Sequence, residues 1–424
     1  MKKSIRLLLL IVVASMLLSG CVMRTVDELY CLPKRSQSDD DMQAVIDSAM
    51  TGLSYCAPLY GQNRQMMQPA DLDGDGVEEY VVLARGGFQR QLKILIFDQY
   101  ALGYALAHTI ENFGTAFDFI EFANVDNHPG LEIVVGRQMG DGVVRSAAVY
   151  RYGDGGAQQL LEAGYAQILT CDMDEDGRSE LVSVRPGESG EVTSDVVLYR
   201  YEEGQLHVSS QLDIAASAGS IKRMDLVVLQ DGNQAVLAVS EEQDSQMMEL
   251  VAIIGNELHH IYGPTVVDRL HDNFVYPMDV DGDGDTELPE LVPMEGSQEH
   301  AWIRWFGVDA QGSRTDGMYT YYSYADKWYI HIDRSWITKL SVSHDEGICT
   351  FSNRERETVM TIYALTGVNR KEQAQQLGGV VLGSSEYITF AATNGPGAEG
   401  LGITEERVRQ LFYAIDLKLY TEEE

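Results

Sequence analysis

The chain has 424 residues, of which 65 are acidic and 31 basic, and its formal net charge is -34. Because such an acidic surface repels phosphate groups, its charge disfavours nucleic acids and anionic membrane surfaces as partners. The hydrophobic content of 45% is ordinary for a globular protein and argues against a disordered chain. A chain of this length predicts two or more domains, or one long repeat domain.

The N-terminus has the organisation of an export signal. Positive charges, the last at Arg6, precede an apolar run from Leu7 to Leu18. This run is too short for a transmembrane helix, which needs roughly 20 residues. The ending Leu18-Ser19-Gly20-Cys21 resembles the lipobox of bacterial lipoproteins, which implies cleavage before Cys21 and attachment of a diacylglycerol to its sulfur. We therefore expect residues 1–20 to be a signal peptide and Cys21 to anchor the protein to the cell membrane, facing the extracytoplasmic side.

Residues 21–57 are predicted to form a linker that contains one short helix. The helix is expected from Asp39 to Met50, with acidic residues in its first turn. Cys31 and Cys56 are close in sequence, and export permits a disulfide between them without requiring one. The cysteines form no C-x-x-C pair, so a zinc site is not indicated.

An acidic motif recurs through residues 58–309. Full copies of the pattern D-x-D-x-D-G-x-x-E begin at Asp71, Asp172 and Asp279. Weaker copies begin near residues 124 and 227, so the motif returns about every 52 residues. An interval this regular indicates an internal structural repeat.

Each copy of the motif is followed by the same series of strand-like segments. A β-rich run comes directly after the motif, as at residues 80–83 and 181–184, and two further short runs complete the unit. Several short strands per unit, without helical periodicity between them, predict an all-β array. A four-stranded sheet repeated radially is a β-propeller, so we expect a mainly β fold with a propeller-like domain of about five blades. An elongated β-solenoid is the alternative, but its repeats are usually much shorter.

The acidic loops on this period resemble the FG-GAP and VCBS repeats of integrin-α-type propellers, in which such loops carry calcium. The resemblance covers roughly Pro58 to Phe306. It rests on the loop pattern and the spacing, because no Phe-Gly…Gly-Ala-Pro signature precedes the loops. The resemblance implies a calcium-binding propeller.

The chemistry of the motif also favours calcium. Carboxylates at alternate positions, a glycine that permits a sharp turn and a further acid can surround one hard cation, and Ca²⁺ takes about six to eight oxygen ligands. The candidate ligands are Asp71, Asp73, Asp75, Glu79 and the carbonyl of Val77 in the first loop; Asp172, Asp174, Asp176 and Glu180 in the second; and Asp279, Asp281, Asp283 and Glu287 in the third.

Two other interpretations of the loops are possible. An EF-hand begins in the same way, but its twelfth position needs a glutamate, and the first two loops have Val82 and Ser183 there. The other is a set of solvated acidic turns that bind no metal. The weaker copies, one with His128 at its centre and one that keeps only Asp231, are expected to be metal-free.

Residues 310–424 are predicted to form a small α+β domain. Strands are expected at 348–351, 358–365 and 386–392, and helices at 370–377 and 405–413. The domain opens with an aromatic cluster comprising Tyr319, Tyr321, Tyr322, Tyr324, Trp328 and Tyr329. Such a cluster could form a platform for sugar rings, but packing between strands is the favoured interpretation.

These features favour a non-enzymatic cell-envelope lipoprotein that acts as a calcium-stabilised binding or adhesion scaffold. Its expected partner is a protein or a cell-wall polysaccharide. The alternative is a propeller enzyme that acts on polysaccharide through carboxylates in a central channel, since such catalysis leaves no local motif. No G-x-S-x-G or H-E-x-x-H motif is present. A transporter's substrate-binding lipoprotein is disfavoured, because it would alternate strands with helices in two lobes.

Overall fold

The computed structural model describes residues 37–87, 91–101, 103–140, 144–153, 156–186, 193–295, 297 and 300–415. Antiparallel sheets make up most of this part of the chain, which confirms the mainly β fold. The signal peptide, Cys21 and Cys31 lie outside the described residues, so the lipid anchor and the disulfide stay predictions. Among the described residues, no helix is both long enough and apolar enough to cross a membrane.

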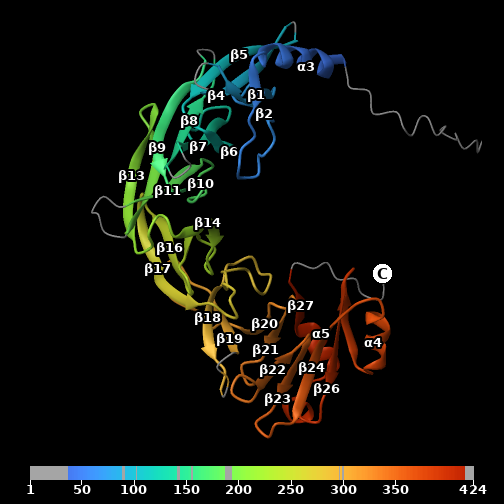
Figure 1. Cartoon of the computed structure of the whole chain (residues 1–424). Helices are drawn as coiled ribbons and strands as arrows, with labels where there is room; N and C mark the ends of the chain where they lie inside the picture. The colour runs from blue at the N-terminus through green and yellow to red at the C-terminus, as the bar shows by residue number, and fades with distance from the viewer. Residues whose placement is uncertain are drawn as a thin grey trace, which may run out of the picture.

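The first helix, α3 (Gln37–Ala49), lies beside the first sheet (Figure 1). Ile46 and Met50 are spaced four residues apart and so lie on one face of the segment. Both are buried in a cluster with Val82, Leu95 and Phe97 of the sheet. This contact fixes the described N-terminal segment to the repeats, and the helix agrees with the one expected at residues 39–50.

Four sheets of the same topology follow α3, and in each the consecutive strands pair antiparallel. The first sheet contains β2 (Met67–Ala70), β3 (Glu79–Gly86), β4 (Gln91–Tyr100) and β5 (Gly103–Asn112), and β1 (Leu53–Tyr55) pairs with the end of β3 that β2 leaves free. The second contains β6 (Ala116–Ala123), β7 (Glu132–Met139), β8 (Val144–Arg151) and β9 (Gln158–Tyr165). The third contains β10 (Gln167–Cys171), β11 (Glu180–Pro186), β12 (Ser194–Glu202) and β13 (Gln205–Ile214). The fourth contains β14 (Ile221–Val228), β15 (Gln234–Glu241), β16 (Ser245–Ile254) and β17 (Glu257–Asp268).

The burial of these strands explains their composition. The second strand of a sheet is covered on both faces, as in β7, whose first six residues are all buried. Strands covered on both faces need near-continuous apolar runs, which is the pattern found directly after each acidic motif. The fourth strand faces solvent on one side, and β13 accordingly carries mostly exposed or half-exposed residues.

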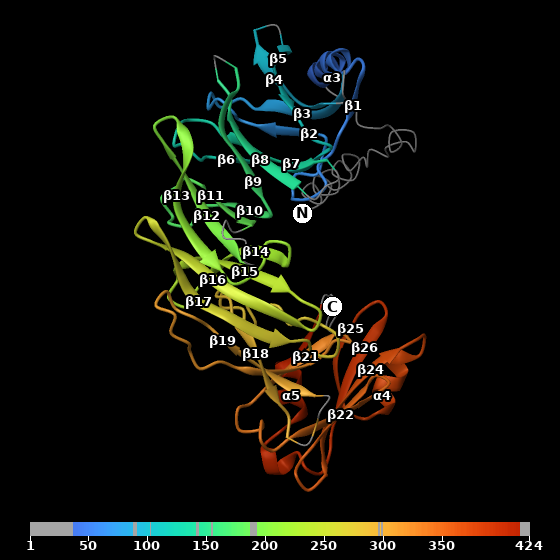
Figure 2. The same ribbon diagram turned by 60° about the vertical axis from the view of Figure 1, so that its left-hand side comes forward.

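Figures 1 and 2 show the sheets following one another along an arc. The first strands β2, β6, β10 and β14 lie on its concave side, and the fourth strands β5, β9, β13 and β17 lie on its convex side. Neighbouring sheets contact each other through equivalent strands, β10 with β14 on the inner side and β13 with β9 and β17 on the outer side. This is the way in which propeller blades are arranged, with the first strand innermost.

A fifth sheet has the same order and takes in the aromatic cluster. It contains β18 (Leu288–Pro293), β19 (Ala301–Phe306), β20 (Tyr319–Ser323) and β21 (Trp328–Ile332), and β27 (Phe412–Ala414) is added at its edge. The expected boundary at residue 309 therefore falls inside a sheet, between β19 and β20. Aromatic residues make up much of the last two strands of this unit, YTYYS and WYIHI, which hid their equivalence in the sequence.

The sixth sheet forms the C-terminal α+β part, and its strand order is β22-β23-β24-β26-β25. It contains β22 (Ser341–Asp345), β23 (Ile348–Ser352), β24 (Thr358–Thr366), β25 (Val380–Ser384) and β26 (Ile388–Asn394). Helix α4 (Arg370–Gln376) links β24 to β25, and η1 (Glu399–Leu401) and α5 (Glu405–Leu411) lead back to β27. One hydrophobic core joins the fifth and sixth sheets and includes Trp302, Trp328, Phe351 and Phe390. The strands and helices expected here are present, but the second helix ends at Leu411, because Phe412–Ala414 pairs with β21 as strand β27. Strands β22 and β25 are additional.

Candidate metal centres

Two of the acidic loops connect the first strand of a sheet to the second, and the third precedes the first strand of the fifth sheet, where Met278 and Glu287 form an isolated bridge. Loop 71–79 leads from β2 into β3, loop 172–180 leads from β10 into β11, and loop 279–287 leads into β18. The weaker copies, loop 124–132 and residues 229–233, lie in the same place between β6 and β7 and between β14 and β15. The repeat in the sequence is therefore a repeat in the structure.

The glutamate that ends the motif is buried and bonds to the backbone at the start of its loop. Glu79, Glu132, Glu180 and Glu287 are each at most 5% exposed. Each accepts a hydrogen bond from the backbone N–H seven residues before it, at 2.7, 2.9, 3.0 and 2.9 Å respectively. The glutamate thus has a structural role in addition to the metal-binding role expected from the sequence.

The first aspartate of the motif folds the loop around its own carboxylate. Asp71 accepts hydrogen bonds from the backbone N–H groups of Gly74 and Gly76, at 2.8 and 3.1 Å. Asp279 and Asp172 are bonded to their own loops in a similar way. Gly76 has a φ of 87°, a left-handed conformation that glycine adopts without steric cost. The motif's glycine is therefore required by the turn.

Three groups of carboxylates are brought together by this folding. The ligand atoms of each group lie within 4.8 Å of one another, and the groups are Asp71, Asp73 and Glu79; Asp172, Asp174 and Glu180; and Asp279, Asp281 and Glu287. Sets of carboxylate oxygens suit a hard cation such as Ca²⁺.

The third aspartate of each motif lies outside these groups. Asp75, Asp176 and Asp283 each accept a hydrogen bond from the backbone N–H two residues on, at 2.8, 2.9 and 2.9 Å. In the first loop that N–H belongs to Val77, whose carbonyl was expected to be a fifth ligand. The structure thus brings together three of the four carboxylates expected in each loop.

The grouped carboxylates repel one another unless a cation lies between them. Burial, followed by the charges of nearby aspartates, raises the pKa of Glu79 and of Glu287 to about 7. Burial also raises the pKa of Glu180. At separations near 5 Å, each pair of charges repels by about 0.8 kcal/mol even in a water-like dielectric. A divalent cation would remove this repulsion.

Two arginines that the sequence analysis missed contact the loops from a neighbouring strand. Arg151, the last residue of β8, forms an ion pair with Asp126, and its Nε lies 3.9 Å from Glu132 Oε1. Arg200 in β12 forms an ion pair with Asp174, and its Nη2 lies 3.4 Å from Glu180 Oε1. Each arginine lies on the strand that pairs with the one following the motif. Only the pairing register of these two strands could have revealed it, and spacing within the motif does not show that register.

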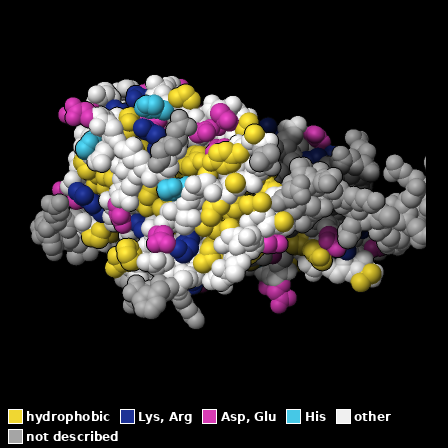
Figure 3. Space-filling view, turned by 90° about the horizontal axis from the view of Figure 1, so that it is seen from above, with side chains coloured by type: hydrophobic (Ala, Val, Ile, Leu, Met, Phe, Trp, Pro, Cys, Tyr) yellow, Lys and Arg dark blue, Asp and Glu magenta, His cyan; other side chains and the backbone are white. Residues whose placement is uncertain are grey.

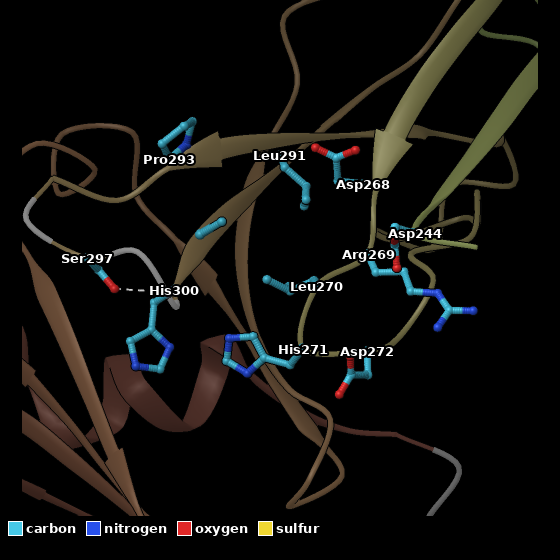
Figure 4. A pocket seen from close by; sticks show the side chains of 11 residues that line it. Asp244, Asp268, Arg269, Leu270, His271, Asp272, Leu291, Pro293, Ser297 and His300 are labelled. Atoms are coloured by element: carbon cyan, nitrogen blue, oxygen red, sulfur yellow. Dashed lines mark hydrogen bonds between the residues drawn. The ribbon is translucent and has the colours of Figure 1, made fainter. Parts of the chain in front are cut away.

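A separate cavity of about 960 Å³ is lined by residues of the fourth and fifth sheets and of the turn between them (Figure 4). The ring centroids of His271 and His300 lie 5.3 Å apart. His271 and Asp272 have φ values of 51° and 63° in a tight turn. Non-glycine residues seldom adopt this conformation, and it presents both side chains beside the cavity. Asp244 and Asp268 are also among its lining residues.

The aromatic cluster mainly serves packing. Tyr321, Tyr322 and Trp328 are at most 6% exposed, which agrees with the favoured interpretation from the sequence. Tyr329 stacks on Tyr322 at 4.7 Å and on Tyr413 of β27 at 5.0 Å. Tyr413 is 41% exposed, so this stack reaches the surface at one end.

No protein-family model and no curated protein matches the chain. Among solved structures, the rhamnogalacturonan lyase YesW is 10% identical, with a TM-score of 0.31 over 68% of this chain and 66% of that one. The exotype rhamnogalacturonan lyase YesX is 11% identical, with a TM-score of 0.31 over 65% and 61% of the two chains. A protein from Lactobacillus plantarum is 12% identical, with a TM-score of 0.32 over 71% and 84%. The aligned part thus spans less than two thirds of either lyase, and likeness at this level does not establish a shared activity.

Proposed function

We propose that this protein is a lipid-anchored, extracytoplasmic binding scaffold whose β-sheets are stabilised by calcium. The observation that carries the proposal is the recurrence of an acidic triplet at the same turn of three sheets. A stabilising ion bound at this turn would hold the first two strands of a sheet together. It would leave the exposed strand edges and connections free to contact a partner.

The proposed affinity range follows from the location. Extracytoplasmic calcium modules typically have a Kd of about 10⁻⁴–10⁻³ M, which suits a compartment outside the cytoplasm. At ten times Kd, calcium would add about 1.4 kcal/mol of stability per site. Several sites together would then make a large contribution, because the whole free energy of unfolding of a domain is only about 5–15 kcal/mol.

The proposed partner is a protein or a cell-wall polysaccharide. Seen from above, hydrophobic side chains are spread across the surface among charged and polar ones (Figure 3). Large exposed apolar residues on and beside the first sheet include Tyr60 at 57% and Phe113 at 66% exposure. Mixed surfaces with exposed aromatic residues suit contact with proteins and with sugars.

The anchor is proposed from Cys21 and can be tested separately from calcium. In a bacterial host, the wild-type chain should incorporate radiolabelled fatty acid and sediment with membranes. Cys21→Ala should neither incorporate the fatty acid nor sediment with membranes through a lipid anchor. Cys31→Ala is the matched control and should behave like the wild type. Equal labelling of the wild type and Cys21→Ala would refute the anchor.

Calcium dependence is tested by thermal unfolding of the full-length protein in detergent. We expect the midpoint in EGTA to rise by several degrees across a calcium titration, and magnesium at the same concentrations to shift it much less. Mg²⁺ demands near-ideal octahedral geometry and gives up its water reluctantly. A midpoint unaffected by either ion would mean that the loops are acidic turns.

A carbohydrate-acting enzyme is the second candidate function, and the cavity containing His271 and His300 is the observation that favours it. Imidazoles beside carboxylates can act as general acids and bases near neutral pH. The test is a screen of acidic and neutral polysaccharides for new reducing ends and for unsaturated uronates. Activity lost in His271→Ala and kept in the matched variant His207→Ala, on the exposed face of β13, would establish this function. The absence of turnover on the whole panel would leave the binding scaffold.

A further inference from the structure

Asp98, Arg151 and Arg200 occupy equivalent positions in the first three sheets. In each sheet, the residue before this position pairs across the strands with the residue that follows the loop-closing glutamate. The pairs are Phe97 with Tyr80, Tyr150 with Ile133, and Tyr199 with Leu181. The third strand of every one of these sheets therefore presents one side chain beside the acidic loop of its own sheet.

Each of the three side chains is also held by a residue of the next sheet. Asp98 accepts a hydrogen bond from the hydroxyl of Tyr152 at 3.0 Å. Arg151 donates to the hydroxyl of Tyr201 at 2.6 Å, and Arg200 donates to Asn256 Oδ1 at 3.2 Å. These contacts orient the side chains, so the equivalence concerns their placement as well as the strand register.

The two arginines contact the carboxylates that would bind a metal. Arg151 reaches the third residue of its motif, Asp126, and the closing Glu132. Arg200 reaches the same two positions in its own loop, Asp174 and Glu180. A guanidinium placed between two carboxylates supplies the positive charge that a divalent cation would otherwise bring. A cation entering such a loop would have to displace it.

Loop 71–79 has the opposite arrangement. The equivalent position holds Asp98, which adds negative charge beside Asp73 and Glu79. Oε1 of Glu79 is fully buried and has no hydrogen-bond partner among the described residues, whereas the corresponding oxygens of Glu132 and Glu180 face an arginine. A buried carboxylate oxygen without a partner is costly, and a bound cation would satisfy it.

We propose that this third-strand position determines which loops take a metal ion. Arg151 and Arg200 serve as built-in cations that make loops 124–132 and 172–180 independent of metal, and Asp98 directs calcium to loop 71–79. The role of the two arginines does not depend on calcium binding elsewhere in the chain. The role of Asp98 at loop 71–79 rests on the proposed calcium binding. It follows that loop 172–180, despite its complete motif, binds no calcium in the wild-type protein.

The test is to count the calcium ions bound per chain by equilibrium dialysis of the full-length protein in detergent. We expect Arg200→Gln to bind one more ion than the wild type and Asp98→Arg to bind one fewer. Arg178→Gln is the matched control, because Arg178 lies in loop 172–180 and pairs with Asp176, which is outside the carboxylate group. Arg178→Gln also removes one positive charge next to this loop and should leave the count unchanged.

A second comparison keeps the proposal testable if Arg200→Gln does not fold. Asp172→Asn in the wild-type background should leave the ion count unchanged, and Asp71→Asn should lower it by one. A lower count for Asp172→Asn, or a folded Arg200→Gln that binds as the wild type does, would overturn the inference. An unchanged count for Asp71→Asn would instead remove the proposed calcium site of that loop, while the result for Arg200→Gln would still decide the role of the arginine.

Discussion

Loops 71–79 and 172–180 carry the same acidic motif at the same turn and differ in the residue that faces them. In the first, the facing residue is Asp98 and a buried oxygen of Glu79 has no partner among the described residues. In the second, Arg200 lies against Asp174 and Glu180. The comparison teaches that identical motifs can face opposite charges, and under our proposal only a loop that the residue across the sheet does not neutralise binds a metal.

Loop 124–132 extends the comparison to a loop whose acidic motif is incomplete and which is also faced by an arginine. Its motif has lost the acidic residue at its fifth position, where His128 stands, and Arg151 pairs with an Asp126 side chain that is wholly buried. The backbone bond from Val125 to Glu132 is nevertheless kept at 2.9 Å. The turn itself is therefore retained although the motif is incomplete and an arginine faces it.

The largest expected effect comes from breaking this buried pair. Asp126→Ala should lower the free energy of unfolding by about 3 kcal/mol, because it removes the wholly buried carboxylate that forms the ion pair with the half-buried Arg151. The loss should be the same in EGTA and in calcium. Chemical denaturation in both conditions would measure it. Asp225→Ala, which breaks the exposed pair with Arg223, is the control and should cost less than about 1 kcal/mol.

The second largest effect should be a pH dependence of stability that comes from loops 71–79 and 279–287. The pKa values of Glu79 and Glu287 are raised to about 7 by burial and by neighbouring aspartates. The folded protein then holds more protons than the unfolded chain between the unfolded pKa, about 4.5, and 7, so in EGTA its stability should fall as the pH rises through this window and stay low above it. Unfolding midpoints measured from about pH 5 to pH 8 should show this fall.

The control for this effect is the double variant Glu79→Gln, Glu287→Gln. It cannot ionise at either position, so its midpoint should fall less over the same pH range, and saturating calcium should flatten the wild-type curve in the same way. A double variant with the wild-type slope would assign the pH dependence to the general negative charge of the chain.

Calcium binding in loop 71–79 should contribute less. Asp71→Asn should lose about 1.4 kcal/mol of stabilisation at calcium ten times above Kd, because the site no longer forms. In EGTA the variant should lose less than this, since the amide oxygen still accepts from Gly74 and only the bond from Gly76 to the second oxygen is lost. Calcium titrations followed by differential scanning calorimetry would check both points. An equal loss from Asp172→Asn would contradict the distinction between the loops.

Much of the architecture could be predicted from the sequence. The constant interval of the motif and the apolar run after it indicated repeated β units, because strands buried on both faces need such runs. The fifth unit was only half recognised, since β20 and β21 replace aliphatic residues with Tyr321, Tyr322 and Trp328. A repeat is recognised in a sequence by similar side chains at equivalent positions. A change from aliphatic to aromatic residues at these positions therefore conceals the repeat.

The site was predictable only where it is local. The carboxylates of Asp71, Asp73 and Glu79 are close in sequence, and their grouping agrees with the motif. Arg200 is twenty residues beyond Glu180 and reaches it through strand pairing, so its effect depends on the register between β11 and β12. Charge balance across a sheet is a tertiary property, which a motif confined to one loop does not contain.

The smallest expected effect concerns the fourth sheet, where the loop has lost nearly all its acids. Asp231 accepts hydrogen bonds from the backbone N–H of Asn233 at 3.3 Å and of Ala310 at 3.0 Å, and the second bond ties the loop to the fifth sheet's β19–β20 connection. Asp231→Asn keeps one acceptor oxygen and loses the other, so we expect a loss of about 1 kcal/mol, the usual net contribution of one hydrogen bond. The loss should be identical in EGTA and in calcium. Any calcium-dependent difference between this variant and the wild type would mean that a single aspartate suffices to recruit the ion, and the role assigned to the facing residue would then have to be given up.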